Sequence, residues 1–293
     1  MKVLILGVEG MLGHKLYQVF QENFNTFGTM QGNVEDYAKY NLFDEKTILS
    51  NVNAFDIASI KDALNQIHPN VVVNCIGIIK QLKEAKNPEI SIAINSLFPH
   101  QLAKLSSRYN FRLFHISTDC VFSGRKGNYK EEDISDAEDL YGRTKYLGEV
   151  GYGNCLTLRT SIIGRELNTS NGLLEWILPQ NGKKIQGYTN AIYTGFTTNF
   201  FAAELKKIIL QHPKLSGLFH LSSNPISKFD LLQIIKKQFH LEFKIESYNA
   251  FYCDRSLDST KYRIKTGFVP PSWEKMIEQL CLDKTPYFQW RKR

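Results

Sequence analysis

The sequence predicts an α/β fold, in which a doubly wound parallel sheet carries a smaller C-terminal lobe. Short apolar runs rich in Val and Ile alternate with segments of helical periodicity, as in a sheet covered on both faces. Glycine or hydroxyl side chains follow the ends of these runs, at Gly7, Gly77, Ser117 and Thr160. The carboxyl ends of parallel strands meet at one edge of a sheet, so these residues should gather where such folds bind ligands.

The first half of the chain supplies most of the expected sheet. Strands are expected at 2–6, 25–29, 69–77, 111–117 and 155–159, and helices at 11–20, 59–67, 92–105 and 141–150. Residues 30–54 are polar and lack a periodic pattern, so they are interpreted as a long excursion. Pro99 is expected to kink or restart the helix at 92–105.

The pattern changes after about residue 165. Helices are expected near 172–178, 198–210, 228–238 and 273–281, with short strands at 219–221 and 243–245. We therefore expect a first domain at 1–165, to which about 194–224 returns, and a lobe formed mainly by 166–293.

Composition narrows the function classes. With 293 residues, 43% apolar and 22% charged, the chain is typical of a soluble globular protein, and its first apolar run is too short for a signal peptide. Five cysteines without a C-x-x-C pair indicate free thiols in a reducing compartment, so a cytoplasmic location is expected. The net charge of +7 includes no long basic block, which argues against nucleic acid as a partner and suits a small anionic ligand. The seven histidines show no ligand spacing, so no metal site is expected.

Three glycines lie where the first strand should turn into the first helix. Gly7 ends the strand, and Gly10 and Gly13 flank the start of the helix. Glycine lets a backbone approach a diphosphate closely, and a helix N-terminus offers unpaired N–H groups to it. The pattern favours a nucleotide site over an ordinary turn.

The second strand decides which dinucleotide suits such a site, because an acidic residue at its end binds the NAD ribose. Gln31 stands near that position, while Glu35 and Asp36 come later in the sequence. The sequence leaves NADH and NADPH open, and NADPH should be tolerated because no carboxylate follows the strand. Asp56 could meet the adenine or cap the next helix.

Tyr141 and Lys145 lie four residues apart, so on a helix they share a face. A nearby ammonium should lower the pKa of the phenol and let it exchange a proton with a substrate oxygen. Ser117, Thr118 and Asp119 end the strand at 111–117 and could hold the same oxygen.

These motifs resemble the extended short-chain dehydrogenase/reductases, and within them the dTDP-4-dehydrorhamnose reductase group. The matching stretches are the three glycines, NCIG at 74–77, IN at 94–95, STDCVFSG at 117–124, YGRTK at 141–145 and LRTSIIG at 158–164. The resemblance implies a Rossmann-type sheet, an NADH or NADPH cofactor, and catalysis by Thr118, Tyr141 and Lys145. It implies a cofactor site made of Gly7, Gly10, Met11, Leu12, Gly13, Asp56, Ile57, Cys75, Ile76, Gly77, Asn95, Ser117, Tyr141, Lys145 and Ser161.

The resemblance also implies that the substrate is a nucleotide-diphosphate sugar with a 4-keto-6-deoxy ring. The expected contacts are Trp176, Lys183, Lys184, Tyr188, Asn190, Lys228 and Arg255. Among these, Arg255 best suits the diphosphate, since its planar fork gives paired hydrogen bonds. The stretch GFTT at 195–198, where the family has G-x-P-T, and Ile162, where it has Trp, leave the exact sugar open.

Other functions remain open at this point. An epimerase or dehydratase of the same class would keep the glycines, the tyrosine and the lysine, although Cys120 after Asp119 speaks against a dehydratase. A non-catalytic NADP-binding subunit, like the regulatory subunit of methionine adenosyltransferase, would look similar. A homodimer is compatible with the sequence, and no membrane partner is expected.

Overall fold

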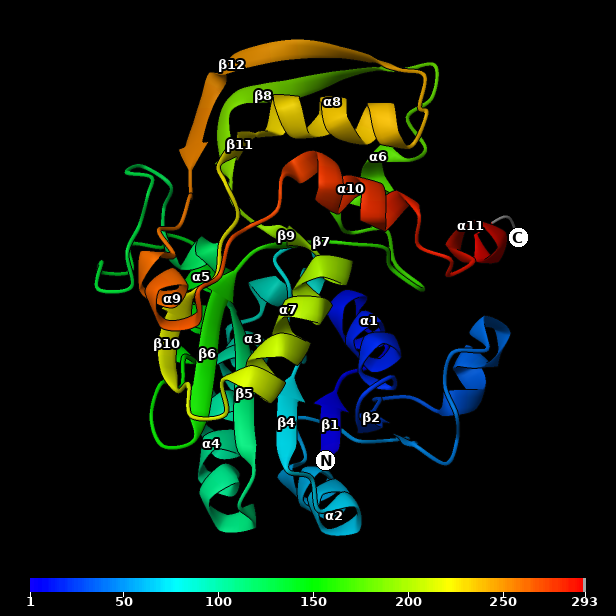
Figure 1. The fold of residues 1–293 in the computed structure, drawn as a ribbon, viewed down its shortest axis with the longest axis vertical. Helices are drawn as coiled ribbons and strands as arrows, with labels where there is room; N and C mark the ends of the chain where they lie inside the picture. The colour runs from blue at the N-terminus through cyan, green and yellow to red at the C-terminus, as the bar shows by residue number, and fades with distance from the viewer. Residues whose placement is uncertain (292–293) are drawn as a thin grey trace.

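The computed structural model describes residues 1–291, and its centre is a seven-stranded parallel sheet (Figure 1). The strands are β1 (Lys2–Leu6), β2 (Asn25–Thr29), β3 (Ile48–Leu49), β4 (Val71–Asn74), β5 (Arg112–Thr118), β6 (Cys155–Thr160) and β10 (Gly217–His220). Their order is β10-β6-β5-β4-β1-β2-β3. From β1 the chain adds β2 and β3 toward one edge of the sheet, and then reverses to add β4, β5, β6 and β10 toward the other edge. The doubly wound α/β fold is confirmed, and such a reversal is where these sheets bind ligands.

The apolar strands bury both of their faces. Val3 and Ile5 pack with α1 (Met11–Phe20) and α7 (Thr198–Gln211) in one core cluster. Leu4 and Leu6 belong to a second cluster with α2 (Ile57–Ile67) and α4 (Phe98–Tyr109). Continuous runs such as KVLIL therefore form strands because successive side chains point to opposite, equally apolar layers.

Two expectations for the first half were wrong in detail. The excursion at 30–54 contains the 3₁₀ helix η1 (Val34–Tyr40) and strand β3. The expected helix at 92–105 consists of α3 (Pro88–Ser91), a π-helical segment η3 (Ile92–Leu97) and α4. Pro99 lies in the first turn of α4, directly after the π-helical segment, which agrees with the expectation that it restarts the helix.

The C-terminal lobe contains a second sheet, of order β11-β8-β12, which arches over α8 (Lys228–Gln238) in Figure 1. Its strands are β8 (Lys184–Tyr193), β11 (Ile226–Ser227) and β12 (Lys244–Asp254). The remaining elements are η2 (Lys83–Lys86), η4 (Asp119–Val121), α5 (Leu140–Leu147), β7 (Ile162–Ile163), α6 (Leu173–Ile177), β9 (Phe196–Thr197), α9 (Thr260–Thr266), α10 (Trp273–Cys281) and α11 (Tyr287–Trp290). No helix within residues 1–291 is long and apolar enough to cross a membrane.

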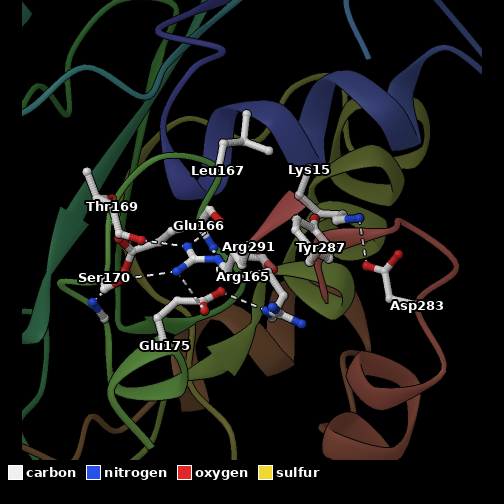
Figure 2. A network of polar contacts seen from close by, with 12 residues as sticks. Lys15, Arg165, Glu166, Leu167, Thr169, Ser170, Glu175, Asp283, Tyr287 and Arg291 are labelled. Carbon is white, nitrogen blue, oxygen red and sulfur yellow. Dashed lines mark hydrogen bonds and ion pairs between the residues drawn. The ribbon is translucent and has the colours of Figure 1, made fainter. Parts of the chain in front are cut away.

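Ion pairs join the end of the described chain to α1 and to α6 (Figure 2). Lys15 pairs with Asp283 at 2.7 Å, and Arg165 pairs with Glu175 at 2.7 Å. Arg291 contacts the same Glu175 at 3.2 Å. Removing one partner of a buried pair is costly, so these contacts fix the C-terminal segment against the first domain.

Candidate active site

The turn from Gly7 to Gly13, called the glycine turn below, packs α1 closely against the end of β1. Gly7 has a φ of +81°, which favours glycine, and a side chain at Gly13 would overlap the carbonyl oxygen of Gly7. Gly10 precedes the first helical residue, and a side chain there would meet only the Gly7 oxygen, at 3.5 Å. Gly7 and Gly13 are thus required by the protein itself, whereas Gly10 leaves open space in front of the helix.

The N-terminus of α1 is suited to an anion. No side chain within residues 1–291 caps it, so the first N–H groups, from Met11, Leu12 and Gly13, face outward without a side-chain acceptor. Unpaired N–H groups and the helix dipole together favour a phosphate at this point. These residues fit the diphosphate of a dinucleotide.

A cavity beside this turn lies between the ends of β1 and β2 and the loop after β3. It is lined by Gly7, Glu9, Thr29, Met30, Gln31, Val52, Asn53, Ala54, Phe55, Ile76, Ile78 and Ile94. Two predicted cofactor residues lie elsewhere. Asp56 is exposed and caps α2, accepting a hydrogen bond from the N–H of Ala58 at 2.9 Å, and Ile57 lines a hollow between α2 and α4.

The end of β2 does carry a carboxylate, contrary to the expectation from sequence. It comes from the glycine turn, because Glu9 Oε1 accepts a hydrogen bond from the N–H of Gln31 at 2.9 Å. The prediction considered only residues that follow β2 in sequence. Glu9 precedes β2, in the turn between β1 and α1, and the fold brings its side chain to the end of β2.

Three more predicted cofactor residues lie in the loop after β4 or contact it. The Asn95 amide accepts from the N–H of Ile78 at 2.9 Å and donates to its carbonyl at 3.0 Å. Asn95 therefore shapes this loop, and both ends of its amide are engaged by the backbone. Cys75 and Gly77 lie in the same loop, and burial raises the pKa of the Cys75 thiol.

Two close approaches position α5, the helix of Tyr141 and Lys145. A side chain at Gly142 would overlap the carbonyl oxygen of Cys120, and one at Gly148 would overlap that of Asn95. The helix is therefore pressed between the turn after β5 and the π-helical segment. Asp139 caps it by accepting from the N–H of Gly142 at 2.7 Å.

Thr118, Tyr141 and Lys145 meet at the ends of β4 and β5. Thr118 ends β5, and hydrogen bonding with it is among the influences on the pKa of Tyr141. The Lys145 ammonium is buried and donates to the carbonyl of Ile116 at 2.7 Å. The structure brings all three predicted catalytic residues to the sheet edge that carries the glycine turn.

The predicted effect of Lys145 on Tyr141 is wrong for this structure. Burial raises the pKa of Tyr141, and the charges of Cys120 and Asp119 act in the same direction. Burial lowers the pKa of Lys145 to about 8, although Glu149 and Cys75 oppose this. The spacing correctly placed both residues on one helix, but the ammonium is bonded to the β5 backbone.

Glu149, whose carboxylate is buried, lies four residues after Lys145 and just past the end of α5. It accepts two hydrogen bonds from Arg159, at 2.8 and 2.7 Å, and one from the hydroxyl of Ser117 at 2.6 Å. Ser117, a predicted cofactor residue, is therefore held by Glu149 beneath the site. A fixed arginine–carboxylate pair of this kind orients its neighbours.

The family model described as the RmlD substrate binding domain matches residues 1–285. The chain belongs to this family. The beta subunit of methionine adenosyltransferase 2 from Xenopus tropicalis is 23% identical over 256 residues, which cover 82% of this chain and 72% of that protein. The dTDP-4-dehydrorhamnose reductase of Aggregatibacter actinomycetemcomitans is 23% identical over 304 residues, 95% of this chain and 98% of that protein.

A solved structure shows the same fold as this RmlD-family chain. It is a dTDP-4-dehydrorhamnose reductase from Bacillus anthracis in complex with NADP, with a TM-score of 0.79 at 21% identity. The match covers 95% of this chain and 98% of that chain. The resemblance inferred from the motifs is confirmed at the level of the family and the fold.

The second lobe of the RmlD-family chain brings two cations toward the catalytic residues. Lys228, the first residue of α8, lies over the ring of Tyr193 with its nitrogen 3.9 Å from the centroid. Burial lowers the pKa of Lys228 to about 8, opposed by the charge of Asp119. Asp119 is itself buried beside Thr118, and burial raises its pKa while Arg255 and Lys228 lower it. Lys228 and Arg255 therefore face the catalytic end of β5.

Arg255 follows β12 and is only partly engaged by the protein. Its Nε donates to the carbonyl of Phe122 at 2.7 Å, and no described residue accepts a bond from its terminal nitrogens. These nitrogens are the ones that bind phosphate in pairs. Ser161, another predicted cofactor residue, lies beside Tyr193. Burial raises the pKa of Tyr193, and hydrogen bonding with Ser161 opposes this shift.

The other predicted substrate residues are not brought to this place. Lys183 and Lys184 are exposed at the start of β8, so Lys184 is separated from Tyr193 by ~30 Å of extended strand. Tyr188 packs on Tyr248 and Phe251 on the outer face of the small sheet. Asn190 donates to the carbonyl of Asn249 at 2.8 Å, and Trp176 is 43% exposed on α6.

Sequence reasoning missed three residues of the site. Glu149 has a local signal, because it lies four residues after Lys145 and follows Gly148, which packs against Asn95. Tyr193 and Glu9 have no comparable signal in the sequence. Tyr193 contacts Lys228 and Glu9 contacts Gln31, and both partners are distant in sequence. Within residues 1–291, no group of three or more His, Cys, Asp or Glu is arranged to hold a metal ion.

Proposed function

We propose that the protein is an NAD(P)H-dependent reductase of a nucleotide-linked 4-keto-6-deoxy sugar, in the biosynthesis of deoxysugar and polysaccharide precursors. The observation that carries the proposal is that Thr118, Tyr141 and Lys145 lie at the sheet edge that carries the glycine turn. Family membership supports it, as do a relative named dTDP-4-dehydrorhamnose reductase and a neighbour bound to NADP.

The cofactor, when bound, supplies a hydride to the keto carbon. The N–H groups at the start of α1 would bind its diphosphate, and Lys145 a ribose hydroxyl. Tyr141 stays protonated at neutral pH because its pKa is raised, so it can donate a proton to the oxygen of the reduced carbonyl. The Thr118 hydroxyl would hydrogen-bond to the same oxygen as charge develops there.

The substrate would lie between this edge and the second lobe. Arg255 and Lys228 would bind the nucleotide diphosphate, and both cations lie near enough to Asp119 to lower its pKa. This division assigns the cofactor to residues 1–165 with about 194–224, and the sugar nucleotide mainly to residues 166–293. We further propose a cytoplasmic homodimer, which size-exclusion chromatography with light scattering would test.

The test of the function is turnover. The purified protein should oxidise a reduced nicotinamide cofactor in the presence of a panel of 4-keto-6-deoxy sugar nucleotides, followed by absorbance. Tyr141→Phe should lower kcat by about 10²–10⁴-fold while cofactor binding is unchanged, since only a proton donor is lost. Tyr146→Phe, an exposed tyrosine on the same helix, should have little effect. Wild-type turnover by Tyr141→Phe, with chemistry rate-limiting, would contradict the assignment.

A second candidate function is a non-catalytic regulatory subunit, which the similarity to methionine adenosyltransferase 2 subunit beta favours. It predicts cofactor binding without turnover of any sugar in the panel, together with binding to a methionine adenosyltransferase. Epimerisation is distinguished from reduction by the cofactor balance, because a reductase oxidises one reduced cofactor for each sugar nucleotide converted, whereas an epimerase causes no net oxidation of the cofactor.

A further inference from the structure

Glu9 in the glycine turn has an unused carboxylate oxygen. Its Oε1 accepts a hydrogen bond from Gln31, but its Oε2 is buried and has no hydrogen-bond partner within residues 1–291. Burying a polar oxygen without a partner is costly, so a ligand that donates a hydrogen bond to it would be favoured. Burial raises the pKa of Glu9, and the hydrogen bond from Gln31 opposes that shift.

Glu9, which carries this oxygen, lines the cavity beside the start of α1. The apolar side chains of Val52, Ala54, Ile76 and Ile78 line the cavity and suit an adenine ring. A dinucleotide with its diphosphate on α1 and its adenine among these side chains has its adenosine ribose between them. Glu9 lines the cavity at this intermediate position, next to the end of β2.

None of the residues that line the cavity, all within the described range 1–291, is Lys or Arg. The phenol of Tyr37 in η1 is close enough to be affected, because its pKa is raised by burial and by the charge of Glu9. A second negative group placed here would therefore meet the carboxylate without compensation.

We infer that Glu9 makes this protein select NADH over NADPH. Its free oxygen accepts a hydrogen bond from the ribose 2′-hydroxyl of NADH, and its charge opposes the 2′-phosphate of NADPH. The inference rests on the proposed function, because it concerns the cofactor of that reaction. It replaces the expectation from sequence that NADPH is tolerated.

The experiment is a titration of the full chain with NADH and with NADPH at pH 8, followed by nicotinamide fluorescence without any sugar. Wild-type protein should bind NADH about tenfold or more tightly than NADPH, since like charges in contact are strongly unfavourable. Glu9→Gln should tighten NADPH binding by about tenfold and weaken NADH binding only a few-fold. Glu35→Gln is the matched control, since it removes the same charge from an exposed position in η1 and should leave both affinities unchanged.

The outcomes separate the inference from the proposed function. Equal binding of both cofactors by wild-type protein, or an equal gain in NADPH affinity from Glu9→Gln and Glu35→Gln, would overturn the inference alone. Binding of neither cofactor would overturn both. Absence of sugar turnover with preserved NADH selectivity would overturn only the reductase function, leaving the role of Glu9 in place.

Discussion

Replacing Gly13 with alanine tests whether the glycine turn is fixed by the packing of α1. The added Cβ would overlap the carbonyl oxygen of Gly7 and would lie 2.9 Å from the Cα of Val8, where ordinary contact begins at 3.4 Å. The obstructing atoms belong to the backbone, so no side chain can rotate away. The start of α1 must therefore move by about 1 Å, because the overlap with the Gly7 oxygen is the larger of the two.

Two opposing effects set the size of the change. Overpacking costs about 1–3 kcal/mol, and a contact with backbone belongs at the upper end of that range. Alanine is favoured over glycine inside a helix by about 1 kcal/mol, which offsets part of the cost. The free energy of unfolding should therefore fall by about 2 kcal/mol, and Tm by roughly 3 °C for a chain of this length.

Gly10→Ala is the matched control. Its Cβ would meet only the Gly7 oxygen at 3.5 Å, and the φ of −76° suits alanine, so stability should change by less than about 1 kcal/mol. The assay is thermal and urea unfolding of both variants without cofactor, followed by NADH titration. Gly10→Ala should lose affinity for NADH while remaining stable. Equal stability of the Gly13→Ala variant and the wild type would refute the packing argument.

Two further predictions concern acid stability and substrate binding. Burial lowers the pKa of His14 to about 4 and that of His220 to about 3, so the unfolded chain binds more protons as the pH falls below 6.5. Burial lowers the pKa of His115 as well. Stability should therefore fall by about 2 kcal/mol for each of the three histidines between pH 6.5 and 5, as measured by urea unfolding, and His14→Gln should remove about a third of that fall. An unfolding free energy that is the same at pH 7 and pH 5 would contradict this. Arg255→Lys should raise the KM of the sugar nucleotide by about tenfold or more, because paired hydrogen bonds to phosphate are lost, with NADH affinity unchanged. Lys183→Ala, a change at an exposed and distant cation, should leave KM unaffected, and an equal rise in both variants would remove Arg255 from the site.

The sequence allowed the glycine turn and the Tyr141–Lys145 pair to be predicted, because both depend on spacing within one turn or one helix. Strand β8 was missed, since its buried positions include Gly187 and Ala191, which weaken the apolar alternation. The low exposure of Asp119 depends on α8 and β12, which lie over a hundred residues later. The pKa of Tyr141 also could not be predicted, because burial is a property of the packed helix and not of its spacing.

The contacts between α1 and α11 have a consequence for how the chain folds. His14 bonds the carbonyl of Gly10 at 2.8 Å and the hydroxyl of Tyr287, 273 residues later, at 2.7 Å. Contacts of such long range form late, since the loop that they close must first lose its conformational freedom. During synthesis, the surface of α1 that packs against α11 therefore stays exposed until Tyr287 has been added to the chain. A protease that cuts between α10 and α11 would reopen that surface, although the cut lies far along the sequence from the glycines.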